Sequence, residues 1–345
     1  MRKKANPYTL TFGKEPTQQI SRLLQTDAII EAFEEDLPSN QVFIFTGVRG
    51  SGKTVLMSSI KNRLEEEEDW ITVELNSSTD MLQSLGAKLY SNNAVSEFFK
   101  SLDISLSLFG IDVKVKKTAK IVDMETAITA MLKSLKKHKK KLLITVDEAV
   151  NNEYMRAFAG AFQIFVRQDA PIYLLMTGLY ENISELQDEK NLTFLYRAPK
   201  SPMKPLNMSA IASNYQKVLE VSKEDAHEMA KLTCGYSYAF QVLGYLTYAN
   251  GGDYKNVIDD YRQYLSEYVY EKIWSELSSK DRELALAVAE VESGKVQDIR
   301  EVLGWETNEF NPYRNRLIKK GIVSGELRGY VKFTLPLFAE FVREA

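Results

Sequence analysis

The stretch "VFIFTGVRGSGKTVLM", residues 42–57, decides the fold of this chain. Its first five residues are β-branched or aromatic, which predicts a short, fully buried strand. Three glycines follow, and the chain resumes as a helix near Lys53. A glycine-rich turn between a buried strand and a helix is typical of a loop that wraps an anion.

The spacing within this turn fits G-x-x-x-x-G-K-[ST], with Gly50 as an additional glycine. Backbone N–H groups can wrap phosphate oxygens only where some residues take positive φ, which glycine does without steric cost. We therefore expect a nucleoside triphosphate site in which Lys53 reaches the β- and γ-phosphates and Thr54 ligates Mg²⁺. The residues expected to contact ATP here are Gly47, Val48, Arg49, Gly50, Ser51, Gly52, Lys53, Thr54 and Val55.

A second buried run, "LLITVD" at 142–147, ends in the adjacent acids Asp147 and Glu148. Two carboxylates at the end of a buried strand are costly unless they face a cation. We expect Asp147 to hold Mg²⁺ and Glu148 to act as the general base toward the attacking water. The alternative is that both acids form only the solvated end of a strand.

Strand-like and helix-like segments alternate through the first two hundred residues. This alternation predicts an α/β fold, a parallel sheet sandwiched by helices. An alternating run at 103–116 predicts an inserted β-hairpin, and residues 76–78 are expected to cap the helix that begins near Thr79. The predicted strands are 42–46, 70–75, 142–147 and 171–178, and the predicted helices include 53–64, 123–137 and 153–167.

The pattern changes after a proline-rich linker at 197–205. We expect a core domain over residues 1–205, an all-helical lid over 206–274 and a third domain over 275–345. The third domain has three helical segments followed by a two-stranded wing, which predicts a winged helix-turn-helix.

Residues 275–345 contain 11 Lys and Arg against 12 Asp and Glu, a net charge of −1, so this domain is not basic as a whole. Basic residues nevertheless gather on its third helix and wing, the elements that would touch DNA. Winged helices also bind proteins, and that alternative stays open. The candidate DNA contacts are Arg314, Arg316, Lys319, Lys320, Arg328 and Lys332.

The segments "GVRGSGKT", "LLITVDEA" and "YLLMTG", in this order, resemble the AAA+ branch of P-loop ATPases. The similarity is greatest to its origin-recognition-like and STAND-like clades, and it extends to bacterial ATP-binding proteins carrying "TFGKEP", "LTFLYRAPK" and "FQVLGY"-type segments. It covers nearly the full length, and it implies an ATPase core, a helical lid and a winged helix.

The resemblance also implies roles for further residues. Thr177 takes the place of the residue that senses the γ-phosphate, where asparagine is more usual. Arg197 resembles the arginine that offsets transition-state charge, with Arg156 and Arg167 as competing candidates. The adenine pocket would use Phe12, Pro16 and Ile20, and the lid segment "CGYSYAFQ" has Tyr238 where the related groups carry proline.

Composition narrows the function further. The net charge of −3 shows that the chain as a whole is not a polycation, and one cysteine with two histidines argues against a zinc site built from Cys and His. The single cysteine fits a reducing compartment, and no apolar run reaches the roughly 18 residues of a membrane span. We expect a cytoplasmic protein without membrane contact.

Two functions fit these observations. The first is a slow Mg²⁺-dependent ATPase whose nucleotide state controls a winged helix that contacts double-stranded DNA. The second is a STAND-like ATP/ADP switch in which the winged helix serves autoinhibition or binds a protein partner. Nucleotide-dependent oligomers are compatible with either function.

Overall fold

The computed structural model describes residues 5–11, 16–36, 38–102, 104–110, 121, 123–190 and 192–345. The chain divides into two compact units. The sheet unit comprises residues 23–46 and 54–201, and the C-terminal unit comprises residues 1–22, 47–53 and 202–345. The phosphate loop predicted above therefore belongs to the C-terminal unit, together with the residues expected to form the lid and the winged helix.

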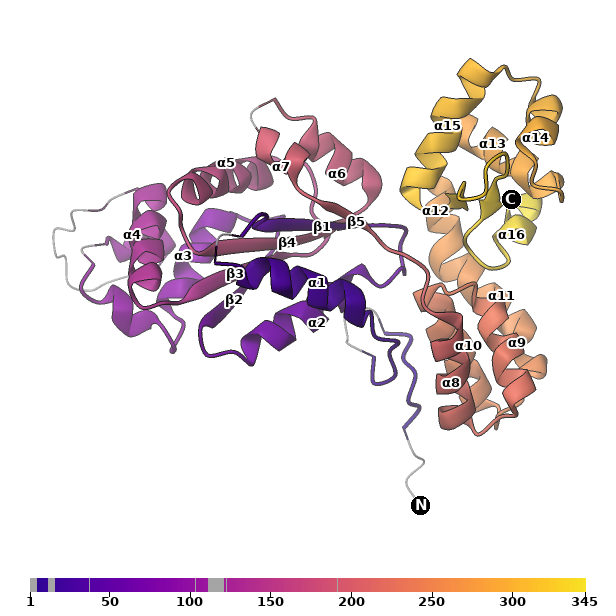
Figure 1. The fold of residues 1–345 in the computed structure, drawn as a ribbon, viewed down its shortest axis with the longest axis horizontal. Coiled ribbons are helices and arrows are strands. Elements are labelled where there is room, and N and C mark those ends of the chain that lie inside the picture. Colours follow the sequence, from indigo (N-terminus) through magenta and orange to yellow (C-terminus); the bar gives the residue numbers. More distant parts are fainter. Residues whose placement is uncertain are drawn as a thin grey trace. The chain divides into compact units, whose positions relative to one another are not determined.

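The sheet unit is built on a five-stranded sheet with the order β2-β3-β4-β1-β5 (Figure 1). Its carboxyl ends are aligned, because Thr46 lies opposite Gly178 and Val146 lies opposite Met176 in parallel register. The predicted parallel α/β sheet is thereby confirmed. Its strands are β1 (Val42–Thr46), β2 (Trp70–Leu75), β3 (Lys141–Val146), β4 (Ile172–Gly178) and β5 (Lys200–Pro202).

Both faces of the sheet are covered by helices. On one face Ile44, Ile144 and Leu174 join a core to which the helices α3, α4 and α5 contribute. On the other face the ring of Phe33, from α1, lies 4.9 Å from that of Tyr173. This double burial explains why the strands are continuous apolar runs. The helices of this unit are α1 (Leu23–Glu34), α2 (Lys53–Glu65), α3 (Met81–Tyr90), α4 (Met124–Lys137), α5 (Glu153–Arg167), α6 (Tyr180–Gln187) and α7 (Thr193–Arg197).

Two local expectations are wrong. The cap of α3 is Asp80, whose carboxylate accepts from the Gln83 N–H at 3.0 Å, and not a residue from 76–78. In the predicted hairpin, Leu106–Phe109 forms a 3₁₀ turn, and Ile104 makes only an isolated bridge to Ile121. The Phe109 ring packs against Gly86 of α3, so a tertiary contact overrides the alternating pattern. The rest of the predicted hairpin, 111–116, and its first residue, 103, lie outside the described residues.

The C-terminal unit has one continuous apolar core, which includes Tyr215 and Phe240 as well as Val342 near the end of the chain. The N-terminal segment joins this core through Tyr8, whose hydroxyl donates to the Asn214 side chain at 2.8 Å. The helices before the wing are α8 (Met208–Leu219), α9 (Lys223–Thr233), α10 (Ser237–Ala249), α11 (Ile258–Leu265), α12 (Glu271–Ser275), α13 (Ser279–Glu290), α14 (Val296–Leu303) and α15 (Thr307–Lys320).

The last of these helices lead into a small β-hairpin, β6 (Val323–Ser324) and β7 (Lys332–Phe333), and then into α16 (Phe338–Glu344). Ser278 caps α13 in a reciprocal capping box with Asp281. Gly304 and Gly321 end α14 and α15 in the left-handed conformation. The helical lid and the winged arrangement predicted from the sequence are both present.

Within the described part of the chain, none of the helices has the length and apolar content that crossing a bilayer requires.

Candidate functional site

The carboxyl edge of the sheet unit brings together three of the predicted site residues. The hydroxyl of Thr54, in the first turn of α2, lies 3.2 Å from Oδ1 and 3.0 Å from Oδ2 of Asp147. Thr177, at the end of β4, is fully buried and donates its hydroxyl hydrogen bond to Oδ1 of the same carboxylate. The parallel register explains this meeting, because β3 and β4 end side by side.

Glu148 follows Asp147 in a left-handed conformation, with φ of 50°. Its N–H donates to the Thr177 hydroxyl at 3.0 Å and to Asp147 Oδ1 at 3.1 Å. The Ser77 hydroxyl donates to the Glu148 carbonyl at 3.4 Å. The exposed Glu148 side chain is thus carried by a backbone that several hydrogen bonds hold in an unfavourable conformation, which is common at functional positions.

Mg²⁺ fits this arrangement. It prefers oxygen ligands and is usually held by one or two carboxylates together with the phosphates of the substrate. The Asp147 carboxylate and the Thr54 hydroxyl are close enough to share one ion. Among the described residues there is no cluster of three or more His, Cys, Asp or Glu that could hold a metal ion.

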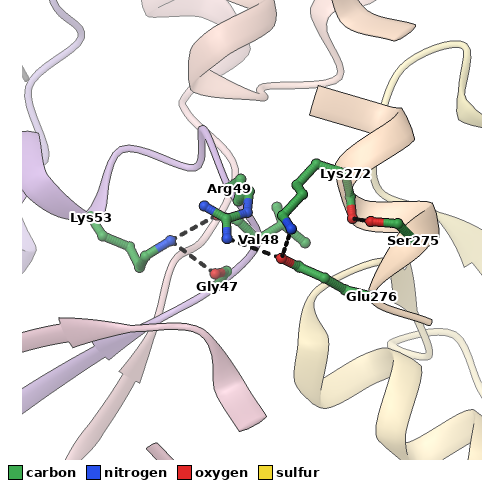
Figure 2. Close-up of polar contacts among 7 residues, drawn as sticks. All are labelled: Gly47, Val48, Arg49, Lys53, Lys272, Ser275 and Glu276. Carbon is green, nitrogen blue, oxygen red and sulfur yellow. Dashed lines mark hydrogen bonds and ion pairs between the residues drawn. The ribbon is translucent and has the colours of Figure 1, made fainter. Parts of the chain in front are cut away.

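The phosphate loop, residues 47–53, lies in the C-terminal unit. Gly50 and Gly52 have φ of 71° and 90°, so both use the freedom that the sequence predicted for glycine. The ammonium group of Lys53 donates to the carbonyls of Gly47 and Val48 at 3.0 and 2.9 Å (Figure 2). The lysine is therefore folded back onto its own loop.

Three consecutive residues at the start of α10 bind the loop carbonyls. The Tyr236 hydroxyl donates to the Arg49 carbonyl, the Tyr238 N–H donates to the Gly50 carbonyl at 3.0 Å, and the Ser237 hydroxyl donates to the Ser51 carbonyl at 3.0 Å. Burial raises the pKa of Tyr236 well above its ordinary value, so this hydroxyl remains a donor. Burial, with smaller contributions from Tyr268 and Tyr264, raises the pKa of Tyr238 to about 12.

Arg22 binds the same loop through its guanidinium, which donates to the Ser51 carbonyl at 3.3 Å and to the Lys204 carbonyl at 2.6 Å. Burial lowers the pKa of Arg22 to about 10, so the guanidinium stays charged at neutral pH. Neither Arg22 nor Tyr236 was among the residues predicted for the site. For Tyr236 the available signal was the segment "CGYSYAFQ", but its tyrosines fit core positions better than site positions.

The loop also contacts the helix that leads into the winged region. Arg49 donates to the Glu276 carboxylate at 3.0 Å, and Lys272 of α12 lies 3.5 Å from the same oxygen (Figure 2). Val48 is buried in the apolar core of the C-terminal unit. The loop is therefore tied to this unit by side chains as well as by its backbone.

Other predicted site residues are not brought to these contacts. Arg197 is exposed at the end of α7 and forms no ion pair with a described residue. Arg156 lies 3.8 Å from the Glu189 carboxylate, and its competitor Arg167 is in the last turn of α5. Of the adenine-pocket candidates, Ile20 packs against the C-terminal core, Pro16 is half-buried, and Phe12 lies outside the described residues.

The candidate DNA contacts divide by exposure. Lys319, Arg328 and Lys332 are exposed, whereas Lys320 is buried. Arg314 is half-buried, with its guanidinium against Gly325 of the wing.

Arg316 has a partner within the chain. Its guanidinium lies 2.7 Å from the carboxylate of Asp281, a residue that is only 1% exposed. The central carbon of the guanidinium lies 4.8 Å from the centre of the Tyr313 ring. Its guanidinium also donates to the Ser278 hydroxyl at 2.9 Å. Arg316 therefore stabilises the start of α13.

A family model described as a domain of unknown function, DUF8462, matches residues 267–342. No curated protein is detectably similar in sequence. Among solved structures, the chain is similar to the Walker-type ATPase paby2304 of Pyrococcus abyssi. The two are 14% identical, with a TM-score of 0.66, and the match covers 94% of this chain and 96% of that one.

The chain is also similar to the ORC2 protein of Aeropyrum pernix in its ADPNP-ADP complexes. Identity is 12% and the TM-score is 0.59, with 97% of this chain and 96% of that chain covered. The ADP form of the same protein matches with a TM-score of 0.51 at 13% identity, over 97% of each chain. Together with the strand order, the helical lid and the C-terminal β-hairpin, these likenesses show that the chain has the fold of the AAA+ ATPases.

Proposed function

We propose that this protein binds Mg-ATP at residues 47–54 and hydrolyses it slowly, and that its nucleotide state controls the C-terminal winged helix. The observation that carries the proposal is the cluster of Thr54, Asp147 and Thr177 at the end of β3. The glycine-rich loop runs directly into Thr54, so the phosphate-binding N–H groups and one of the two proposed oxygen ligands for Mg²⁺ are contiguous in the chain.

The similarity to ORC2 supports a nucleotide as the ligand, because that protein forms complexes with ADPNP and ADP. When bound, Mg²⁺ would neutralise phosphate charge and orient the terminal phosphate. Lys53 would exchange its two loop carbonyls for phosphate oxygens, which are stronger acceptors because they are charged.

Hydrolysis requires a base, and Glu148 is the proposed one. Asp147 is engaged by three donors, the hydroxyls of Thr54 and Thr177 and the Glu148 N–H, which suits a metal ligand better than a base. Glu148 would take a proton from the attacking water, while Thr177 holds the acidic pair in place. The carboxylate that accepts the proton is exposed, so it can return the proton to solvent.

The Arg49–Glu276 contact supports control of the C-terminal unit by the nucleotide. Arg49 lies within the phosphate loop, and Glu276 lies between α12 and the winged region. A change in the loop on nucleotide binding or release would therefore bias the position of α12. A STAND-like switch that acts on a protein partner would use the same contact. Arg316, one of the candidate DNA contacts, is paired with Asp281 inside the chain, which favours this second function over DNA binding.

Calorimetric titration with Mg-ATP tests the proposal, using wild type and Lys53→Ala. We expect micromolar binding by wild type and none by the variant. ATPase assays with and without duplex DNA then separate the two functions. Stimulation by DNA supports a winged helix that contacts DNA, and slow turnover without a DNA response supports a switch that acts on a protein partner. Equal heats for both proteins would refute nucleotide binding at this loop.

A further inference from the structure

The start of α10 and the phosphate loop satisfy each other's backbone groups. The first N–H groups of a helix lack partners within it, and Tyr236, the N-cap residue, makes no side-chain cap. The Gly50 carbonyl takes the Tyr238 N–H instead. The loop therefore caps α10, and residues 236–238, which we call the strap, bind three successive loop carbonyls.

The strap also determines where the loop N–H groups point. All peptide bonds between described residues are trans, and in a trans peptide the C=O and N–H point in opposite directions. The Arg49 carbonyl is bound by Tyr236, so the Gly50 N–H points away from the strap. By the same reasoning, the Ser237 bond to the Ser51 carbonyl turns the Gly52 N–H away from the strap.

Those two N–H groups are available to a ligand. The Ser51 N–H closes a turn onto the Val48 carbonyl at 3.3 Å, but neither Gly50 nor Gly52 donates a backbone hydrogen bond to a described residue. Two unpaired N–H groups on the side of the loop opposite the strap suit phosphate oxygens.

The strap also explains the additional glycine of the motif, Gly50. The G-x-x-x-x-G-K-[ST] spacing does not require glycine at position 50. A Cβ at Gly50 would collide with the Tyr236 hydroxyl and would lie 2.8 Å from Cβ of Tyr238. A Cβ at Gly52 would lie 3.0 Å from Oγ of Ser237. Close approach of the strap thus accounts for a feature of the sequence that phosphate binding alone does not.

We propose that Tyr236 and Ser237 are positioning residues for phosphate binding, because their hydroxyl groups hold the loop with the Gly50 and Gly52 N–H groups directed at the ligand. This inference rests on the proposed function. It makes nucleotide affinity depend on whether the strap is in place, so any partner that moves α10 away from the loop would weaken nucleotide binding.

Two variants and two controls test the strap by calorimetry with Mg-ATP and Mg-ADP. Tyr236→Phe and Ser237→Ala each remove one hydroxyl donor, and we expect each to weaken both nucleotides about 3- to 10-fold. Ser237→Thr retains the hydroxyl and should bind as wild type. Tyr261→Phe is the matched control, because its buried hydroxyl donates to the Leu232 carbonyl, away from the loop, at 2.9 Å.

The stability of each variant without nucleotide is measured in parallel. We expect Tyr236→Phe and Tyr261→Phe to lose similar amounts of thermal stability, with only the former losing nucleotide affinity. The positioning role of the strap would be overturned if Tyr236→Phe and Ser237→Ala bound nucleotide as wild type does while Lys53→Ala lost binding. The proposed function would still stand in that case. Equal losses of affinity in Tyr236→Phe and Tyr261→Phe would also overturn the positioning role. Unchanged binding by Lys53→Ala would instead refute the proposed function.

Discussion

The hydroxyl of Thr54, in the first turn of α2, lies 3.0 Å from Oδ2 of Asp147, which follows the end of β3. If these two groups share Mg²⁺, Thr54→Ala should weaken Mg-ATP binding by about tenfold and should leave metal-free ATP binding nearly unchanged. Titrations of ATP in the presence of Mg²⁺ and in the presence of EDTA measure these two affinities. Thr54→Ser keeps the ligand oxygen and should behave as wild type; an equal loss in the two conditions would contradict a metal role.

Glu148→Gln removes the proposed base without changing the shape of the side chain. We expect Mg-ATP affinity within about threefold of wild type and turnover reduced by about 10²- to 10⁴-fold, the usual contribution of a general base. Single-turnover hydrolysis measures the chemical step directly. Glu153→Gln, an acid in the first turn of α5, is the control and should turn over normally. Normal turnover in Glu148→Gln would show that another group takes the proton.

Thr177→Val tests whether the buried hydroxyl orients the acidic pair. The variant keeps the volume of the side chain but leaves the Glu148 N–H with only the longer bond to Asp147. We expect kcat to fall at least tenfold with little change in nucleotide affinity, and stability to fall by about 1–3 kcal/mol. Thr177→Ser should restore kcat. A loss of stability without any loss of kcat would limit Thr177 to a structural role.

The exposed basic residues of the winged region test DNA contact separately from stability. Replacing Lys319, Arg328 and Lys332 together by alanine should weaken duplex DNA binding and lower the salt slope by up to about 3, if each contacts a phosphate. Fluorescence anisotropy over a range of salt concentrations measures this. A charge-matched control replaces Lys217, Lys223 and Lys231 of α8 and α9. If both triple variants bind DNA alike, this surface is not a DNA face.

Arg316→Ala should act on stability instead. It leaves the buried Asp281 carboxylate without its cation, so we expect a loss of about 1–3 kcal/mol in the free energy of unfolding. Chemical denaturation measures this loss, with the exposed Arg328→Ala as the control. A variant as stable as wild type would mean that the Ser278 cap and solvent suffice to hold Asp281.

Much of the fold was predictable because its signals are local. The buried strands β1 and β2 were predicted to the residue, since a parallel sheet covered on both faces leaves a continuous apolar run between turns. The strap was not predictable, because Tyr236 and Arg49 are 187 positions apart and the bond is made to a backbone carbonyl. The partner of Arg316 was missed for a similar reason, since an isolated arginine on a helix gives no sign of a buried carboxylate 35 positions earlier.

The Arg49–Glu276 pair allows the coupling between nucleotide and C-terminal unit to be tested without touching the phosphate site. The two side chains are about one-third exposed, so the pair itself contributes only about 0.2–1 kcal/mol to stability. Glu276→Gln should therefore fold and bind Mg-ATP as wild type does. Coupling would be lost: we expect hydrogen exchange in α12 and α13 to respond to nucleotide in wild type and to stop responding in the variant.

Lys272 provides the matched control, because it contacts the same Glu276 oxygen from α12 but has no link to the loop. Lys272→Gln should keep the response of α12 and α13 to nucleotide, since Arg49 still reaches Glu276. If Glu276→Gln responds as strongly as wild type, the Arg49–Glu276 pair does not carry the coupling to α12 and α13, and the strap is the next link to test. In that case Tyr236→Phe, measured by the same exchange experiment at saturating nucleotide, should weaken the response instead.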